Sequence, residues 1–301
     1  MLLTRSLLVT AVAASLLAGC GSAQDGAAPA STPPSAPAVA KDDALAAKVP
    51  PAIASTGKLR VGSNVQNPPN NFYAQDGKTP MGSEVDLANA IAAKLGLKTE
   101  YSDMVFSSLI TSLQSGRIDV TMAAMNDTAE RQQKIDFVDY FTSGITIMVQ
   151  KDNPAGIKGP DDLCGKSVAV NLGTSQEAYA KEQSGKCTAA GKGEVTLTVT
   201  DSDTGNQNQL RTGRVAAILN DLPTAVYISK TAGDGKYFQV VPGAPINGGP
   251  YGIGVNKDNA QLTAAIQGAL QALVDDGTYG KILKNWDVEQ GAIAKVTVNG
   301  K

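Results

Sequence analysis

The sequence predicts an α/β protein built from two similar lobes, and an internal repeat is the first observation behind this prediction. Residues 113–120 (LQSGRIDV) return in outline as residues 210–217 (LRTGRVAA), an offset of 97 residues (210 minus 113). In each copy a helix ends at a glycine, which can take the positive φ that closes the last turn, and a β-branched run then begins a strand. Two copies are too few for a solenoid, so we expect one α/β lobe for each copy.

A second observation is the polar pair that follows each repeated strand, Asn126-Asp127 in the first copy and Asn220-Asp221 in the second. In open α/β sheets, ligands bind outside the carboxyl ends of the strands. The cleft between the two lobes is therefore where we expect a functional site.

Hydrophobic periodicity and turn residues predict the elements of the first part of the chain. Ser83 and Asp86 have the spacing of a capping box, and Gly96 suits the end of the helix that they begin. We expect helices at 83–95 and 107–115 and strands at 59–62, 118–122 and 145–149.

The second part of the chain repeats this order. We expect strands at 167–171, 195–199 and 251–255, a helix from Ser175, a helix opened by Pro223, an amphipathic helix carrying Leu262, Ile266, Leu270 and Leu273, and a last short helix to Trp286. The last two helices have no sheet of their own, so we place them on the first lobe. Lobe one then comprises residues 56–143 and 251–301, lobe two comprises residues 144–250, and two crossings near 141–145 and 247–251 make a two-segment hinge.

The N-terminal residues resemble a bacterial lipoprotein signal. Arg5 precedes an apolar run at 7–17 that is too short to span a bilayer, and residues 17–20 (LAGC) resemble a lipobox. We therefore interpret residues 1–20 as a lipoprotein signal peptide whose Cys20 becomes the lipidated N-terminus, on the outer face of the cell membrane. An ordinary secretory signal with an incidental Cys20 is the alternative. Residues 21–55, rich in Ala, Pro and Ser, indicate a flexible tether.

Composition excludes several classes of function. The 301 residues include no histidine and carry a net charge of −2 without a long basic run. Histidine triads and most zinc or iron sites are thereby excluded, and nucleic acid is not an expected partner. No glycine-rich phosphate loop occurs, so we expect no nucleotide cofactor, and because histidine is absent we expect no metal.

The remaining two cysteines, Cys164 and Cys187, have two interpretations. Export to an oxidising environment favours a disulfide between them, whereas a pair of free buried thiols is the alternative.

Candidate binding residues lie at the junctions between strands and helices. Residues 126–131 (NDTAER) open a short helix whose backbone N–H groups favour an anion, and Arg131 offers a fork that matches a carboxylate. The alternative is that Asp127 or Thr128 only caps this helix and that Arg131 is solvated.

Lobe two offers hydroxyls and a carboxylate toward the same gap. Thr174 and Ser175 follow a strand, and Asp221 stands at the end of the second repeated strand. Each has a plain alternative as a helix N-cap. Together with Arg131 they would suit a small zwitterion, because both signs of charge are present.

These features resemble family 3 solute-binding proteins, the extracytoplasmic receptors of polar amino-acid ABC importers. The resemblance runs from Leu59 to about Trp286 and rests on residues 82–88 (GSEVDLA), 109–110 (LI) through Asp119, 128–131 (TAER), 135–137 (IDF), 172–174 (LGT), 213–215 (GRV), 251–253 (YGI) and 276–279 (DGTY). It implies a periplasmic-binding-protein-like clamshell of type II and, as partners, an ABC permease with its ATPase. Cys164-Gly165-Lys166 with Cys187 resembles a variant found among lipoproteins of high-GC Gram-positive bacteria, which supports the disulfide.

The resemblance also implies roles for single residues. Arg131 would clamp the ligand's α-carboxylate with help from Asn126, Thr174 and Ser175. Asp221 would take the α-ammonium. Phe106 would lie against the ligand, and a place in the core is its alternative.

Some residues depart from the family pattern. Asn64 stands where the family often has an aspartate for a ligand amine, Asn67 replaces an aromatic residue, and Ser83-Glu84 replaces Phe-Asp. The loss of a carboxylate at Asn64 argues against lysine, arginine or histidine as ligand, because a second buried cation would lack a partner. A neutral polar or small apolar side chain is expected.

The sequence thus predicts a lipid-anchored, monomeric receptor that is not an enzyme and that delivers a free amino acid to its permease. One alternative is a ligand sensor with the same fold. Another is an enzyme like cyclohexadienyl dehydratase, for which Glu84 or Glu177 would have to act as general acid.

Overall fold

The structure is a computed structural model that describes residues 37–301. The predicted signal peptide, Cys20 and the first part of the predicted tether lie outside the described residues. Within residues 37–301, no helix combines the length and the apolar character needed to cross a membrane.

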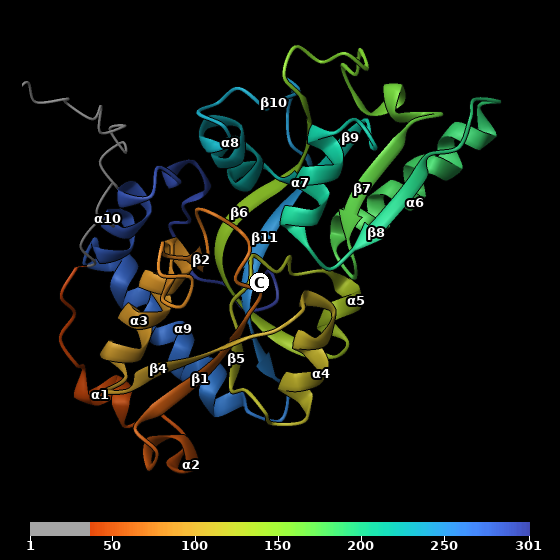
Figure 1. Cartoon of the computed structure of the whole chain (residues 1–301). Helices are drawn as coiled ribbons and strands as arrows, with labels where there is room; N and C mark the ends of the chain where they lie inside the picture. Colours follow the sequence, from red (N-terminus) through yellow and green to blue (C-terminus); the bar gives the residue numbers. More distant parts are fainter. Residues whose placement is uncertain (1–36) are drawn as a thin grey trace, which may run out of the picture. The chain divides into compact units, whose positions relative to one another are not determined.

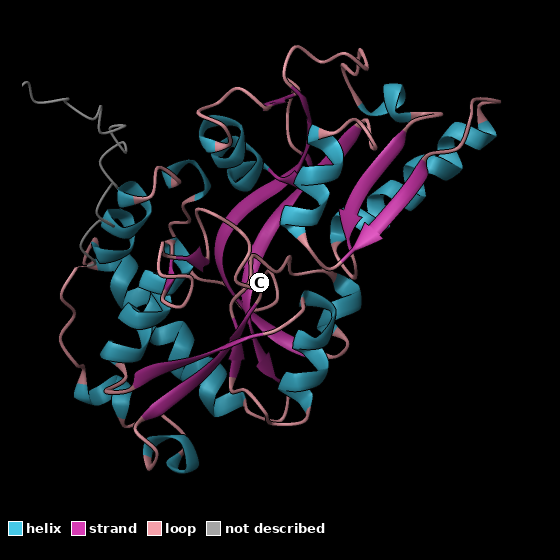
Figure 2. Ribbon diagram, viewed as in Figure 1, coloured by secondary structure: helices cyan, strands magenta, loops and turns pink. Residues whose placement is uncertain are grey.

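The first part of the described chain alternates short strands and helices (Figure 2). Its elements are α1 (Asp43–Ala46), α2 (Pro51–Ala54), β1 (Lys58–Ser63), β2 (Phe72–Tyr73), β3 (Pro80–Met81), α3 (Ser83–Lys94), β4 (Lys98–Asp103), η1 (Phe106–Ser108), α4 (Leu109–Gln114), β5 (Val120–Thr121) and α5 (Ala129–Gln132).

A long strand then leads into the second part. The elements that follow are β6 (Ile135–Gln150), η2 (Pro160–Leu163), β7 (Ser167–Asn171), α6 (Ser175–Ala189), β8 (Thr196–Thr200), α7 (Asp203–Arg211), β9 (Ala217–Asp221), α8 (Leu222–Thr231), β10 (Phe238–Val240), β11 (Ile246–Asn256), α9 (Ala260–Asp275), α10 (Thr278–Asn285) and η3 (Glu289–Gly291).

Strands of both parts belong to one hydrogen-bonded sheet. The strand order is β4-β1-β5-β11-β6-β9-β7-β8, and β10 pairs with β6. The strands β4, β1 and β5 are parallel to one another, and so are β8, β7 and β9. Between these two sets, β6 and β11 run antiparallel and side by side (Figure 1). The two crossings predicted from the sequence therefore lie within continuous strands.

Buried apolar side chains of residues 37–301 form four clusters, two on each side of these crossings, and the larger cluster on each side is taken as its core. One core includes Leu87 and Ile91 of α3. The other includes Val168 and Val170 of β7. We call the parts around these cores lobe one and lobe two. The limits at 143/144 and 250/251 stay a prediction, which this separation of cores supports.

The C-terminal helices pack on lobe one. The apolar stripe of α9, with the spacing of one helix face, is fully buried in the same core as α3, and its members are Leu262, Ile266, Leu270 and Leu273. The helix α10 contacts both α3 and α9. These contacts explain why a helical segment far along the chain returns to lobe one.

The start of α3 differs from the predicted capping box. Ser83 is the first helical residue, and Gly82 precedes it with a φ of 134° and no side-chain cap. A Cβ at Gly82 would come within 2.1 Å of the backbone oxygen of Asn70, so only glycine fits this close approach. The Ser83 hydroxyl instead donates to the side chain of Asn70 at 3.3 Å. Gly96 ends the helix with a φ of 71°, as predicted.

The segment predicted as a flexible tether up to residue 55 includes ordered structure from α1 onward. The predicted end of the tether therefore lies too far along the chain. The side chain of Asp42 caps α1 by accepting from the N–H of Leu45 at 3.0 Å. Val49 and Ile53 are buried in the core of lobe one, and Leu45 packs against it. These three apolar residues recur every four positions within an alanine-rich stretch, which is enough to anchor it.

Two further boundaries also differ. The helix expected at 107–115 begins one residue earlier as the 3-10 turn η1 and continues as α4. The strand expected at 118–122 pairs only as β5, at Val120 and Thr121.

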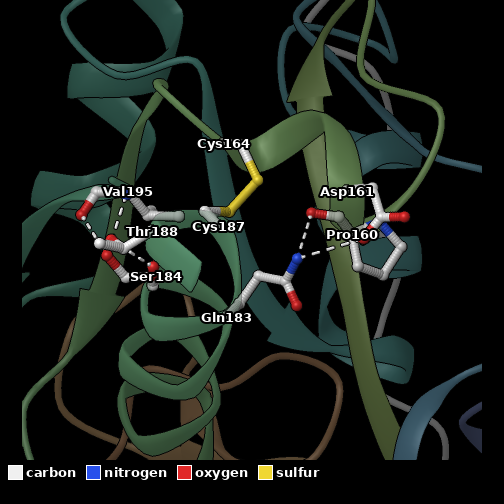
Figure 3. The surroundings of a disulfide bond; sticks show 8 residues. All are labelled: Pro160, Asp161, Cys164, Gln183, Ser184, Cys187, Thr188 and Val195. Carbon is white, nitrogen blue, oxygen red and sulfur yellow. Dashed lines mark hydrogen bonds between the residues drawn. A yellow bond between two sulfur atoms is a disulfide. The ribbon is translucent and has the colours of Figure 1, made fainter. Parts of the chain in front are cut away.

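The disulfide between Cys164 and Cys187 is present, as predicted. Cys187 lies in α6, Cys164 follows η2 directly, and their Cα atoms are 5.4 Å apart. Beside the disulfide, the amide of Gln183 donates to the backbone oxygen of Pro160 at 3.0 Å (Figure 3). The two contacts together hold η2 against α6 in lobe two.

Candidate functional site

A cleft of about 460 Å³, solvent at its mouth included, lies where the strands of both lobes end. Lobe one contributes residues after β1 and β5 and at η1, and lobe two contributes residues at the ends of β7, β8 and β9. The lining residues are Asn64, Asn67, Phe106, Ala123, Ala124, Asn126, Asn171, Thr174, Ser175, Gln176, Asp203, Asn206, Ile218, Leu219, Asn220 and Asp221. Polar side chains dominate this lining.

Asp221 is the last residue of β9 and is buried in the cleft wall. Its carboxylate accepts from the amide of Gln176 at 2.8 Å and does not cap the following helix α8. Burial raises the pKa of Asp221 to about 7. Among residues 37–301, no cation forms an ion pair with it. The positive charge of Arg131 lowers the pKa of Asp221 from a distance, but no cation of the described chain touches its carboxylate.

Arg131 is also buried, so it is not the solvated side chain of the alternative interpretation. Its guanidinium donates to the backbone oxygens of Asn126 at 2.9 Å and Gly173 at 3.1 Å, and it lies 5.3 Å from the ring centre of Phe106. Burial lowers the pKa of Arg131. No carboxylate in the described residues pairs with it.

Arg131 borders the cleft and does not line it. It faces an adjoining groove that shares Phe106, Asn126, Thr174 and Ser175 with the cleft. The guanidinium of Arg131 therefore lies next to residues of the cleft wall but is not part of that wall in this arrangement.

Asn126, Thr174 and Ser175 lie together across the lobes. The hydroxyl of Ser175 donates to the side-chain oxygen of Asn126 at 2.7 Å. Thr174 also caps α6, because its hydroxyl oxygen accepts from the N–H of Glu177 at 3.2 Å. Thr128 caps α5 in the same way, accepting from the N–H of Arg131 at 3.3 Å. The capping alternative thus holds for both threonines, while Thr174 lines the cleft as well.

Phe106 and Asn64 line the lobe one side. Phe106 is half-buried between the guanidinium of Arg131 and the cleft, so it is not solely a core residue. Asn64 is buried, and its amide donates to the backbone oxygen of Met104 at 3.1 Å. This bond leaves the side-chain oxygen of Asn64 as the group free to accept from a ligand.

Asp203 is the principal residue that sequence analysis missed. It begins α7, is buried, and lines the cleft. Burial raises its pKa to about 6. A signal was present: the residue that follows Phe106 by the repeat offset of 97 positions is Asp203.

Neither glutamate considered as a general acid lines the cleft. Glu84 is buried behind Ala124 and accepts from the N–H of Ala124 at 2.8 Å and from the side chains of Asn71 and Tyr140. Glu177 accepts from the N–H of Gly173 at 2.7 Å and pairs with Lys181. Both side chains are occupied in holding the structure around the cleft.

A two-lobed α/β clamshell, with a polar cleft at the strand ends, defines the chain as a small-molecule binding protein. Residues 59–289 match the bacterial extracellular solute-binding proteins, family 3. The chain belongs to this family.

Relatives and solved structures agree with this membership. The chain is similar to the arginine-binding protein ArgT of Corynebacterium glutamicum, with 30% identity over 85% of this chain and 82% of that protein. It is also similar to the L-cystine-binding protein TcyJ of Escherichia coli, with 32% identity over 78% of this chain and 84% of that protein. Among solved structures, an ancestral arginine-binding protein bound to arginine superposes with a TM-score of 0.70 and 38% identity, covering 76% of this chain and 98% of that chain.

Proposed function

We propose that this protein captures a free amino acid in its cleft and delivers it to the permease of an ABC importer. One observation carries the proposal. A buried carboxylate, Asp221, lines the cleft, a buried cation, Arg131, borders it, and neither forms an ion pair within the described chain. An α-amino acid brings a carboxylate for the first and an ammonium for the second, because it is a zwitterion.

Residues from both lobes take part in this site, which supports a mechanism of closure around the ligand. The hydroxyl of Ser175 and the guanidinium of Arg131 already bridge the lobes, to Asn126 and Gly173 respectively. A ligand that contacts both lobes stabilises the closed arrangement more than the open one and so shifts the population toward it. The permease and its ATPase would then recognise the closed form.

Location and assembly follow from the sequence as part of the proposal. Lipidation at Cys20 would anchor a monomer on the extracytoplasmic face of the cell membrane, where a tether would let the lobes reach the permease. The family's extracellular placement agrees with export of the chain.

Isothermal calorimetry on residues 21–301 with the twenty amino acids and cystine tests the proposal. We expect binding by one amino acid or a few related ones. The same ligand at 100 times its Kd should raise the free energy of unfolding by about 2.7 kcal/mol in thermal scans. Absence of binding by every member of the panel, after unfolding and refolding to remove retained ligand, contradicts the proposal.

We also propose that the chain is not an enzyme. The position of Glu84 and Glu177 outside the cleft supports this, because a general acid must reach the reacting atoms. Incubation with prephenate or arogenate should give no turnover, and measurable product would restore the dehydratase alternative. Uptake of the bound amino acid by cells that lack the gene separates an importer, whose loss reduces uptake, from a sensor, whose loss does not.

A further inference from the structure

The cleft contains a second carboxylate besides the one proposed for the α-ammonium. Asp203 follows β8 at the start of α7, whereas Asp221 ends β9, so the two acids come from different strand ends of lobe two. Only 3% of Asp203 is exposed, and the residue lines the cleft.

Neutral amides hold Asp203 in place. The side chain of Gln207 donates to one carboxylate oxygen at 2.7 Å, and that of Asn220 donates to the other at 3.2 Å. Beside it, Asn206 donates to the side-chain oxygen of Asn171 at 2.7 Å. This network fixes the direction of the carboxylate but supplies no positive charge.

No cation in residues 37–301 forms an ion pair with Asp203. A buried carboxylate that neutral groups alone satisfy is costly, and an opposite charge within the site offsets that cost. Because Asp203 lines a cleft, a ligand can bring that charge.

We propose that Asp203 receives a positively charged group on the ligand's side chain, so that the cleft takes a basic amino acid. This inference rests on the proposed function and refines it to one class of ligand. The charges agree: Arg131, Asp203 and Asp221 sum to −1 when ionised, and a basic amino acid carries +1. A neutral amino acid would leave one buried carboxylate without a counter-charge.

The refinement reverses the ligand preference predicted from the sequence. That prediction rests on Asn64, where a carboxylate from lobe one is missing. Asp203 supplies a carboxylate from lobe two instead. The free side-chain oxygen of Asn64 adds an acceptor for the N–H groups of the same cation.

Calorimetry with arginine, lysine and ornithine, against citrulline and glutamine, tests the inference. Citrulline is the decisive comparison, because it has the length of arginine but a neutral urea in place of the guanidinium. We expect the best basic ligand to bind at least about 30-fold more tightly than citrulline. Loss of one partner of a buried charge pair costs about 2 kcal/mol or more, and about 2 kcal/mol corresponds to about a 30-fold change in Kd. Equal binding of citrulline and arginine overturns the inference.

A variant assigns the effect to Asp203. The substitution Asp203→Asn should reduce the preference for arginine over citrulline by about tenfold or more, with little change in citrulline binding. Asp201→Asn is the matched control, since it removes the same charge from an exposed residue of the same loop. Retained citrulline binding by Asp203→Asn shows that the cleft is intact, whereas an unchanged preference overturns the role of Asp203.

The outcomes also separate the two proposals. Tight binding of neutral amino acids alone supports the receptor and overturns the basic ligand. Absence of binding by any amino acid overturns both.

Discussion

The two lobes contain the same structural unit, but it places different side chains at the cleft. In lobe one, the helix of the repeat begins beside Phe106, which lies against the cation of Arg131. In lobe two, the equivalent helix begins at Asp203, and the strand of the repeat ends at Asp221. Corresponding positions of the duplicated unit thus hold an aromatic ring in one lobe and a carboxylate in the other, and both side chains line the cleft.

The difference has a consequence for binding. Lobe one offers the site a cation with an aromatic ring, whereas lobe two offers two carboxylates and most of the amides. Neither lobe alone can neutralise a zwitterion. Strong binding therefore requires both lobes to contact the ligand at once.

Loss of the lobe one cation is the change with the largest expected effect. Arg131→Ala should weaken ligand binding by about 2–5 kcal/mol, because the ligand's carboxylate is left buried without a partner. Arg131→Lys should also weaken binding, since a lysine cannot make the bidentate contact. Calorimetry measures both, with Arg117→Ala, an exposed arginine, as control. Unchanged affinity in Arg131→Ala contradicts the proposed clamp.

Lobe two contains a disulfide, whereas the described part of lobe one does not. Its removal tests how much this crosslink contributes to the stability of the protein. The double substitution Cys164→Ser with Cys187→Ser opens a loop of 23 positions. The loop-entropy account predicts a loss of about 3 kcal/mol in the free energy of unfolding. Urea unfolding measures it, and reduction of the unaltered protein should give the same loss. A midpoint that both treatments leave in place refutes the expectation.

The surplus of carboxylates in lobe two predicts a pH dependence of binding. Burial raises the pKa of Asp221 from 3.8 to about 7 and that of Asp203 to about 6. Bound cationic groups need both carboxylates ionised, so affinity should be nearly full above pH 8 and fall by about 20-fold toward pH 6. Calorimetry in two buffers of different ionisation enthalpy should also detect proton release on binding at pH 6.

The same acids affect the ligand-free protein in the opposite direction. Because their pKa values are raised in the folded state, they favour folding at low pH, and this contribution is lost as pH rises from about 4 to 7. Burial raises the pKa of Glu84 as well, which adds to the trend. Thermal scans at pH 5 and pH 8 without ligand check the sign. A higher melting temperature at pH 8 than at pH 5 would contradict this expectation. For the binding prediction above, higher affinity at pH 6 than at pH 8 would contradict the roles proposed for Asp203 and Asp221.

Matched threonine caps give the smallest effects. Thr174→Ala and Thr128→Ala each remove one cap, and each should lower stability by about 1 kcal/mol. Thr174 also lines the cleft, so its substitution alone should weaken binding as well. Equal affinity of the two variants would show that the Thr174 hydroxyl serves lobe two only as a cap.

Hydrophobic periodicity predicted most of the elements correctly, because apolar residues recur at clear helix or strand spacing along the chain. The α9 stripe is an example, as is the strand at 167–171, which matches β7. The start of α3 was not predictable in the same way. Its glycine N-cap depends on the close approach of Asn70, a contact that local sequence does not record.

The candidate site shows a similar limit. Six of the seven predicted binding residues line the cleft, since strand ends can be located from sequence, and Arg131 borders it. Asp203 was missed because an aspartate in the first turn of a helix normally indicates a favourable contact with the helix dipole. Only its burial among amides distinguishes it, and burial depends on packing.

The shared ladder of β6 and β11 has a mechanical consequence. A joint made of loops can swing without resistance, but two paired strands must twist as a ribbon. Register shifts at 246–249 and 251–252 of β11 concentrate that twist in a short segment. We therefore expect any movement between the lobes to be a twist of this short paired segment, in which both strands turn together.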